Sequence, residues 1–592
     1  MTHSRPDSLF SGFPAVSRAE WKTRAVAELK ERPYDSIVWH TPDGFDLEPW
    51  HSHEEQGVPL ELPRTKVVNS WKNCHRIIVH DPLSANKAAL KCFDLDAAAL
   101  EFVISDPALC SAENLKQLFA GINTSAVAIY FSGNLPPVAE LLKTLATTPG
   151  LALKAGGVLD ATPEASKELD MELFSLAASL PLFRFLAINL VPFHQKGSTA
   201  TQEIALALAG VSDSMHRFLE AGVPVEKIVA AMEIILPVGS SHFTELAKPR
   251  ALRYLLGHLL QAYGASGSTQ LPNLFARTSR RNHSLLDPYT NMLRLTTEAV
   301  SAILGGYETL QIGAFDSGLS VKREIAERIT GNIHLILKEE ASLDRVVDPA
   351  CGSHYLEAMT KALAESAWTL FKEIEAAGGM AEATSSGLIE AMVNASAEKR
   401  QKNLDNRKKT LIGVNRYSWP LSPEQEEHIE ELKLALEQLP EGNETAGYEL
   451  LRIKTLSCSL KSGRTPSVFI WMQGDAATSF RQAAFAEEFF TCGGFAIAGR
   501  ATLPLEEDSY TTVLQNKPDI VVLCIAEKDP VPKAEILCKR VRERESGTIT
   551  VMAGKPPEEK ERLFAAGLDS FIYTGVNVLE MLKSYQRKTG VQ

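Results

Sequence analysis

The chain has 592 residues, of which 45% are hydrophobic and 23% are charged. These proportions exclude a chain that is disordered throughout, and the length allows several domains or one large barrel with a smaller domain. Acidic residues outnumber Lys and Arg by 73 to 61, giving a net charge of −12. A general nucleic-acid binder needs a basic face and is therefore not expected.

The sequence also lacks the patterns of an exported, membrane or metal protein. No run of about 18 apolar residues predicts a membrane span, and the first residues show no apolar signal-peptide core. The eight cysteines form no C-x-x-C pair and no H-E-x-x-H is present, so no metal site is expected. We therefore expect a cytoplasmic α/β protein with reduced cysteines.

Residues 1–35 are predicted to form an arm ahead of the first domain. Ser17 is a candidate N-cap with Glu20 three residues later, which is the pattern of a capping box. In the predicted helix, Trp21, Ala25 and Leu29 fall on one face. The pattern leaves open whether this face packs on its own domain or on a partner.

Residues 36–417 are predicted as one domain. From about Ala126 to Leu343, strand and helix patterns alternate, which is typical of a parallel sheet with crossover helices. The number of units favours a closed (β/α)₈ TIM-type barrel over an open sheet. The clearest predicted strands are Ala126–Phe131, Phe185–Leu190 and Met232–Val238, and the clearest helices are Ala200–Ala221, Pro249–Tyr263 and Pro288–Leu304.

Residues 418–465 are predicted as a linker, punctuated by Pro and Gly around an acidic helix from Glu424 to Leu439. Residues 466–592 then carry five short strand patterns separated by helices, which predicts a doubly wound, flavodoxin-like domain. These strands are Val468–Met472, Phe495–Ala498, Ile520–Ile525, Ile549–Ala553 and Phe571–Tyr573.

The residues alone offer few candidate sites. The loop from Gln473 to Ser479 follows the first strand of the C-terminal domain, where doubly wound sheets bind ligands. It has no phosphate-loop pattern and Asp475 has no acidic neighbours, so a plain turn is favoured. Arg277, Arg280 and Arg281 could contact an anion or form a salt-bridged structural cluster.

Six further motifs stand out in the sequence: Thr278–Asn282, Leu285–Tyr289, Asn291–Arg294, Asp348–Glu357, Thr41–Gly44 and Pro49–His51. Together they resemble the methylmalonyl-CoA mutase family. The family implies a barrel that holds acyl-CoA along its axis, followed by a cobalamin-binding domain, with adenosylcobalamin supplying the radical chemistry that interconverts methylmalonyl-CoA and succinyl-CoA.

The sequence departs from the family pattern in the C-terminal domain. In the cobalamin motif D-x-H-x-x-G, anchored on Asp475, the histidine position is Ala477 and the glycine position is Phe480. Two further contact motifs read Cys524-Ile525-Ala526 and Ala553-Gly554. His428 is the last histidine of the chain, so this domain cannot supply an imidazole.

The predicted barrel also departs from the family pattern. The active-site tyrosine of P-L-Y is His51, and H-S-Q-T-S-G reads as Phe275 to Arg280. Residues 67–80 lack the family's substrate loop, and His194 is offset by two positions from the catalytic histidine. No catalytic, cofactor-binding or metal-binding residue is therefore expected on this chain.

The combination of a retained fold and lost site residues resembles the small, non-catalytic subunits of heterodimeric mutases. This resemblance implies a large catalytic subunit as partner, which would carry adenosylcobalamin and reach the acyl-CoA. It also implies that Trp21, Ala25 and Leu29 of the arm contact that partner. Two alternatives remain open: an assembly scaffold or chaperone for the mutase, and a competent mutase that binds cobalamin through another ligand.

Overall fold

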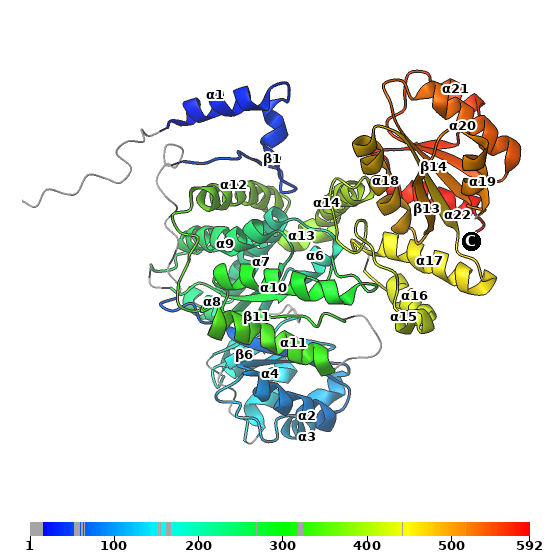
Figure 1. The fold of residues 1–592 in the computed structure, drawn as a ribbon. Coiled ribbons are helices and arrows are strands. Elements are labelled where there is room, and N and C mark those ends of the chain that lie inside the picture. The colour runs from blue at the N-terminus through cyan, green and yellow to red at the C-terminus, as the bar shows by residue number, and fades with distance from the viewer. Residues whose placement is uncertain are drawn as a thin grey trace, which may run out of the picture.

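The computed structural model describes residues 16–591, except 53–59, 61–62, 64–65, 149, 152, 154, 161–166, 181, 268, 318–323, 441 and 516. The chain forms a large barrel and a separate five-stranded domain, joined by a helical linker (Figure 1). An N-terminal helix lies beyond the outer helices of the barrel.

The barrel is one parallel sheet in the order β7-β6-β5-β4-β3-β11-β10-β9-β8. β7 pairs with β6 and β8 pairs with β9, and the two are halves of one strand broken at Phe185. When β7 and β8 are counted as one strand, eight strands follow one another around the sheet, as predicted for a (β/α)₈ barrel. The strands are β3 (Lys72–Val79), β4 (Ala99–Ile104), β5 (Ala128–Gly133), β6 (Ala155–Val158), β7 (Leu182–Arg184), β8 (Leu186–Asn189), β9 (Met232–Val238), β10 (Asn273–Thr278) and β11 (Thr309–Gln311).

Helices surround these strands, and a second helical layer lies outside them (Figure 1). They are α2 (Pro82–Cys92), α3 (Ala112–Leu118), α4 (Val138–Thr147), α5 (Lys167–Ala177), α6 (Val191–Lys196), α7 (Ala200–Glu220), α8 (Val225–Ala230), α9 (His242–Ala262), α10 (Pro288–Leu304), α11 (Glu324–Leu335), α12 (His354–Ala376), α13 (Gly379–Ser385) and α14 (Leu388–Asp405). Short helical turns cover Tyr34–Ile37, Phe93–Leu95, Pro107–Cys110 and Ile336–Glu340.

The predicted start of one helix at Pro249 is wrong. α9 begins at His242 and contains Pro249 in its interior. Proline cannot donate its backbone hydrogen bond and disfavours helix before it, so the sequence pattern places a boundary there. Residues on both sides of Pro249 are buried against neighbouring helices, and this packing overrides the local preference.

The middle of the barrel axis is filled by side chains. The rings of Tyr130 on β5 and Phe275 on β10 meet edge to face with centroids 5.2 Å apart, and both are fully buried. Cys74, Leu159 and Ile235 belong to the same inward-facing cluster. Aromatic rings packed in this way occupy the space that an extended ligand on the axis would need.

The C-terminal domain has the strand order β13-β12-β14-β15-β16, which is the order of a flavodoxin-like sheet. α18 and α22 pack on one face with α17 of the linker, while α19, α20 and α21 cover the other. The elements are β12 (Ser467–Gly474), α18 (Ala476–Thr491), β13 (Ala496–Thr502), α19 (Glu507–Gln515), β14 (Ile520–Ala526), α20 (Val531–Arg544), β15 (Ile549–Ala553), α21 (Lys560–Ala565), β16 (Ser570–Ile572) and α22 (Val578–Lys588).

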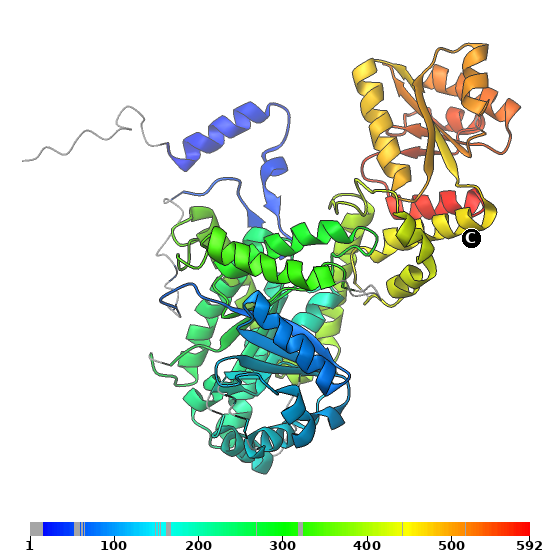
Figure 2. The same ribbon diagram turned by 60° about the horizontal axis from the view of Figure 1, so that its bottom comes forward.

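The linker holds three helices where one was predicted. The acidic segment forms α15 (Pro423–Glu427) and α16 (Ile429–Glu437), because the backbone of His428 leaves helical geometry at φ −104° and ψ 24°. α17 (Ala446–Ser462) follows and lies beside α22 (Figure 2). Its Tyr448 and Leu451 are part of the core beneath the C-terminal sheet.

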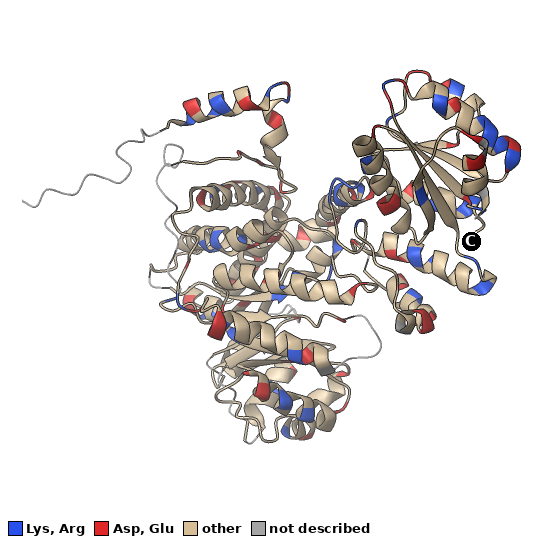
Figure 3. Ribbon diagram, in the orientation of Figure 1, with Lys and Arg blue, Asp and Glu red and all other residues tan. Residues whose placement is uncertain are grey.

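The N-terminal helix α1 (Arg18–Leu29) begins with the predicted capping box of Ser17 and Glu20. None of its residues is buried, and side chains of both charges alternate along it (Figure 3). Its main attachments are a stack of Trp21 on Trp50, at 5.3 Å, and ion pairs from its first turn to Glu48. A short hairpin of β1 (Trp39–His40) and β2 (Asp46–Leu47) follows it.

No helix within the described ranges combines the length and the apolar character needed to cross a membrane.

The packed barrel axis makes a testable prediction about Phe275. Replacing Phe275 by Ala should lower the free energy of barrel unfolding by about 3–5 kcal/mol, because an apolar cavity remains where the ring was. The midpoint of urea unfolding measures this change. Phe564→Ala, at a half-exposed ring on α21, is the control and should cost much less; equal costs for the two variants would show that the axis is not packed.

Candidate functional site

The carboxyl-terminal mouth of the barrel, where enzymes of this fold place their active sites, carries an ion cluster. Arg277 on β10 reaches across the barrel to Glu101 on β4, at 2.8 Å, and Arg76 on β3 approaches the same carboxylate at 3.3 Å. Ser132 also donates to Glu101, at 2.6 Å. Burial alone would raise the pKa of Glu101, but the two guanidinium groups outweigh it and hold that pKa below its usual value.

A second polar network is fully buried behind the mouth. His194 contacts Glu203 through Nδ1, at 2.7 Å, and Ser279 through Nε2, at 2.8 Å. Lys248 donates to the other oxygen of Glu203, at 2.7 Å. Burial holds the pKa of His194 well below its usual value, so the imidazole is neutral.

A serine, a histidine and a glutamate in a row can activate a nucleophile, but this row is closed to substrates. Ser279 is only 2% exposed, and its hydroxyl oxygen accepts from the backbone N–H of Arg281 at 3.1 Å. Both ring nitrogens of His194 are occupied by contacts within the chain.

The three arginines predicted as a possible anion cluster separate in the structure. Arg277 is occupied by Glu101, while Arg281 donates to the carbonyls of His194 and Ser198 and pairs with Glu444 at 3.3 Å. Arg280 is exposed on the loop after β10. Its guanidinium has no ion pair or hydrogen bond within the part of the chain that the structure describes.

Glu444, from the linker, is the centre of a buried charge cluster. Its oxygens lie 3.3 Å from Arg281, 3.6 Å from Arg400 and 2.8 Å from Lys409. Burial would raise the pKa of this carboxyl, but the three cations reverse the shift and lower it to about 2. The cluster joins the loop after β10, the end of α14 and the linker.

A second buried carboxylate, Glu449 on α17, strengthens this junction. It accepts from the backbone N–H groups of Leu285 and Leu286, at 3.2 and 3.3 Å, and from the hydroxyl of Ser284. A carboxylate that receives several hydrogen bonds is satisfied without water. The helix that packs under the C-terminal sheet is thereby fixed to the barrel loop.

The loop after β12 in the C-terminal domain is a plain turn, as favoured from the sequence. Asp475 caps α18 by accepting from the N–H of Thr478 at 2.9 Å, so Ala477 already lies in the helix. The N–H of Asp475 donates to the carbonyl of Ala526 at 2.9 Å. Gly474 has φ +84°, and a Cβ there would collide with the same carbonyl.

The strand ends around this turn are also filled. Cys524 and Ile525, at the end of β14, and Ala553, at the end of β15, are buried. Trp471 on β12 is buried and donates from its indole to the carbonyl of Leu503 at 3.1 Å. The strand ends that form the ligand crevice of doubly wound sheets are thus lined by buried side chains.

His51 lies away from the barrel axis. Its ring is 5.7 Å from that of Tyr355 at the start of α12, a helix of the outer layer. In the described residues no group of three or more His, Cys, Asp or Glu side chains is arranged to hold a metal ion.

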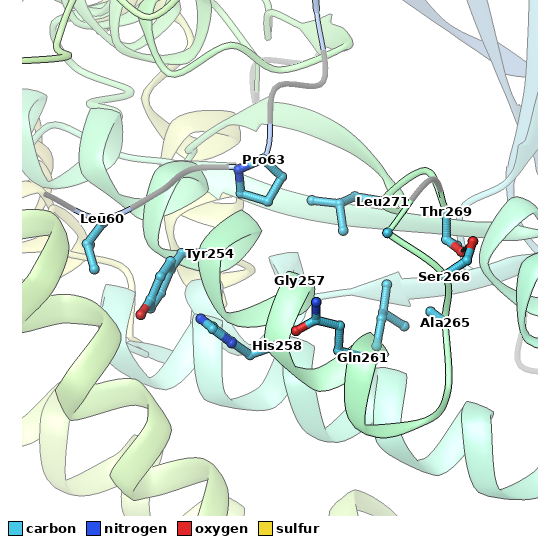
Figure 4. Close-up of a pocket in the computed structure, with 12 residues that line it drawn as sticks. Leu60, Pro63, Tyr254, Gly257, His258, Gln261, Ala265, Ser266, Thr269 and Leu271 are labelled. Atoms are coloured by element: carbon cyan, nitrogen blue, oxygen red, sulfur yellow. Dashed lines mark hydrogen bonds between the residues drawn. The ribbon is translucent and has the colours of Figure 1, made fainter. Parts of the chain in front are cut away.

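Two hollows lie away from these positions. One, of about 490 Å³, is at the end of α9 and next to the loop that enters β10, which is the amino-terminal side of the barrel (Figure 4). Among the described residues that line it, His258 alone has a basic side chain. Another, of about 510 Å³, lies between α17 and α22. Neither coincides with the ends of the strands where chemistry is expected.

The fold and these sites define a mutase-type barrel with an attached flavodoxin-like domain, and the comparisons agree. Residues 88–441 match a sequence model of the family described as methylmalonyl-CoA mutase. The chain belongs to the methylmalonyl-CoA mutase family.

The chain is similar to proteins named as small subunits and as large subunits of methylmalonyl-CoA mutase. The methylmalonyl-CoA mutase small subunit of Porphyromonas gingivalis is 29% identical, covering 99% of each chain. The small subunit of Streptomyces virginiae is 28% identical, covering 99% of this chain and 98% of its own length. The large subunit of Porphyromonas gingivalis is 29% identical over 53% of this chain and 46% of that protein.

The residues present do not fit the cofactor and substrate of the family. The domain that would hold cobalamin has no imidazole, and the motif positions Ala477 and Phe480 lie in α18, directly after its cap Asp475. The packed rings of Tyr130 and Phe275 leave no room for an acyl-CoA along the axis.

Several of these residues were missed from the sequence. Glu101 did have a signal, since it is a lone charge in an otherwise apolar strand, Ala99–Ile104. Glu444 and Glu449 had none, because their partners outside the linker are 35 to 165 positions away in the sequence. Arg76 lacked a visible partner for the same reason.

The buried Glu444 cluster predicts that the free energy of unfolding decreases at acid pH. The pKa of Glu444 is lowered from 4.5 to about 2 in the fold, so its contribution is complete above pH 4.5 and is lost as the pH falls towards 2. Glu444→Gln should lower the unfolding free energy at pH 7 by about 3–5 kcal/mol, because three cations lose their partner. The unfolding free energy of the variant should also depend less on pH in the acid range than that of the wild type.

Urea unfolding between pH 3 and pH 7 measures both effects. Glu390→Gln, at an exposed carboxylate on α14, is the matched control and should change little. A Glu444→Gln protein as stable as the wild type at pH 7 would contradict the role given to the cluster.

Proposed function

We propose that this chain is the non-catalytic small subunit of a cytoplasmic, adenosylcobalamin-dependent methylmalonyl-CoA mutase. The large subunit holds the cofactor and interconverts methylmalonyl-CoA and succinyl-CoA, and this chain stabilises the heterodimer. The observation that carries the proposal is that both ligand positions are filled: the barrel axis is packed by Tyr130 and Phe275, and in the C-terminal domain the motif position Ala477 lies inside α18, which Asp475 caps.

The pattern of relatives supports a two-subunit enzyme. Proteins named small subunit align with this chain over nearly its whole length, whereas the large subunit from the same organism as one of them aligns over about half. A chain that keeps the family fold but has filled its sites retains the surfaces that the fold offers to a partner. We assign residues 1–35 to an arm, 36–417 to the barrel, 418–465 to the linker and 466–592 to the C-terminal domain.

The exposed helix α1 supports a partner contact through the arm. A helix with no buried residue gains little stability from its own chain. Trp21, Ala25 and Leu29 are each half-buried on the face that turns towards Trp50. Tryptophans at such positions are frequent anchors of protein interfaces.

Co-expression tests the proposal. This chain, carrying a tag, is purified from cells that also make a large subunit, and the mutase activity of the complex is compared with that of each chain alone. We expect an equimolar complex that is active, and no activity in this chain alone. Turnover by this chain alone would overturn the proposal, and transient rather than equimolar association would indicate an assembly scaffold.

Trp21 allows a sharper form of this test. Trp21→Ala should raise the Kd of the complex about thirtyfold, which corresponds to about 2 kcal/mol for an interface tryptophan. Phe564→Ala, at a half-exposed ring of the C-terminal domain, is the control and should leave the Kd unchanged. An unchanged Kd for Trp21→Ala, and for a chain lacking residues 1–35, would exclude the arm as part of the interface.

A further inference from the structure

The hollow of about 510 Å³ between α17 and α22 lies where the last helix of the linker meets the last helix of the C-terminal domain (Figure 2). Gln586 of α22 lines this hollow and is buried. Its amide donates to the carbonyl of Leu451 and to the hydroxyl of Thr455 on α17, both at 2.7 Å. These hydrogen bonds fix the two helices to each other, so the hollow is a preformed part of the fold.

Much of the lining of the hollow is apolar. Leu451 on α17 and Val591, which follows α22, are each 3% exposed, and Leu450 is half-buried. Gly447, in the first turn of α17, contributes no side chain that could fill the space. The volume falls within the range of small-molecule sites, about 300–1,000 Å³, which combine apolar walls with a few placed polar groups.

The charged side chains among the lining residues are three cations and one carboxylate. They are Lys454 on α17 and Glu580, Lys583 and Arg587 on α22. Lys583 and Arg587 are four residues apart and therefore lie on the same face of α22.

One of the three cations is neutralised within the chain and two are not. Lys583 pairs with Glu580 at 2.7 Å. Lys454 and Arg587 are exposed, and neither side chain has an ion pair with another residue that the structure describes. One helix supplies an ammonium and the other a guanidinium to the same hollow, beside its apolar lining.

We infer that this hollow binds a small organic carboxylate with an apolar body, of the kind of a medium-chain fatty acid. The hydrocarbon part packs on Leu450, Leu451 and Val591, because burying apolar surface on both sides is favourable. The carboxylate receives charge-assisted hydrogen bonds from Lys454 and Arg587. Both parts of the ligand are needed, since the cations alone are exposed to water and bind a simple anion weakly.

The inference is independent of the proposed role as a subunit, because it concerns neither the mutase reaction nor the arm. The position of the hollow gives such a ligand a structural consequence. α17 is fixed to the barrel loop through Glu449, so a ligand held between α17 and α22 strengthens the connection of the C-terminal domain to the barrel.

Decanoate binding to the full chain tests the site. Decanoate is titrated below its micelle concentration at constant ionic strength, with calorimetry as the readout. Acetate, which has the carboxylate without the apolar body, and decanol, which has the body without the charge, are the reference probes. We expect saturable binding of one decanoate per chain, and at least tenfold weaker binding of both references.

Two variants locate the binding site. Arg587→Gln and Lys454→Gln should each raise the Kd for decanoate at least fivefold, because each removes one partner of the carboxylate. Lys560→Gln, at an exposed residue of α21 on the other face of the C-terminal sheet, is the matched control and should bind as the wild type does. All three side chains are exposed, so the fold should tolerate their replacement, and thermal unfolding without ligand checks this.

Three outcomes would overturn the inference. They are an absence of saturable decanoate binding in the wild type, an unchanged Kd in both Arg587→Gln and Lys454→Gln, and binding of acetate or decanol as tight as that of decanoate.

Discussion

The attachment of the C-terminal domain to the barrel depends on the buried carboxylate of Glu444. The linker places this charge where it is almost fully removed from water, and Arg281, Arg400 and Lys409 compensate it. Such a cluster contributes less net stability than apolar packing of the same volume, but losing one partner is costly. Its main effect is therefore to fix one position of the linker relative to the loop after β10.

The position of the linker determines which partners the neighbouring side chains contact. Arg281 is directed towards Glu444 and the carbonyls of residues 194 and 198, so it is not available to a ligand. Glu449, one turn further along, holds the backbone of residues 285 and 286. The loop that follows β10 thus holds the barrel and the linker together through Arg281 and the backbone of residues 285 and 286.

Much of the fold could be predicted from the sequence. The strand Met232–Val238 is apolar apart from Glu233 and is buried on both faces, and the helix Pro288–Leu304 starts with an Asp cap and a proline; both match the structure to the residue. Local patterns failed where packing decides the outcome, as at Pro249 inside α9. They also missed α17, because its polar surface and flanking glycines are typical of a linker.

The candidate site was predictable only in part. The absence of the cobalamin histidine was visible from the sequence, since it needs no partner to be recognised. The closure of the barrel axis was not, because Tyr130 and Phe275 are 145 positions apart and meet only when the sheet closes. The three neighbouring arginines could not be separated either, since the direction of each depends on acids elsewhere in the chain.

The central claim is that the C-terminal domain has kept its fold while closing the position at which the family binds its cofactor. Equilibrium dialysis of the purified full chain against adenosylcobalamin, read from the corrin absorption band, tests it most directly. The account predicts no retention beyond that of an unrelated control protein. Retention of one corrinoid per chain would contradict it, since the first turn of α18, which Asp475 caps, would then have to open around a ligand.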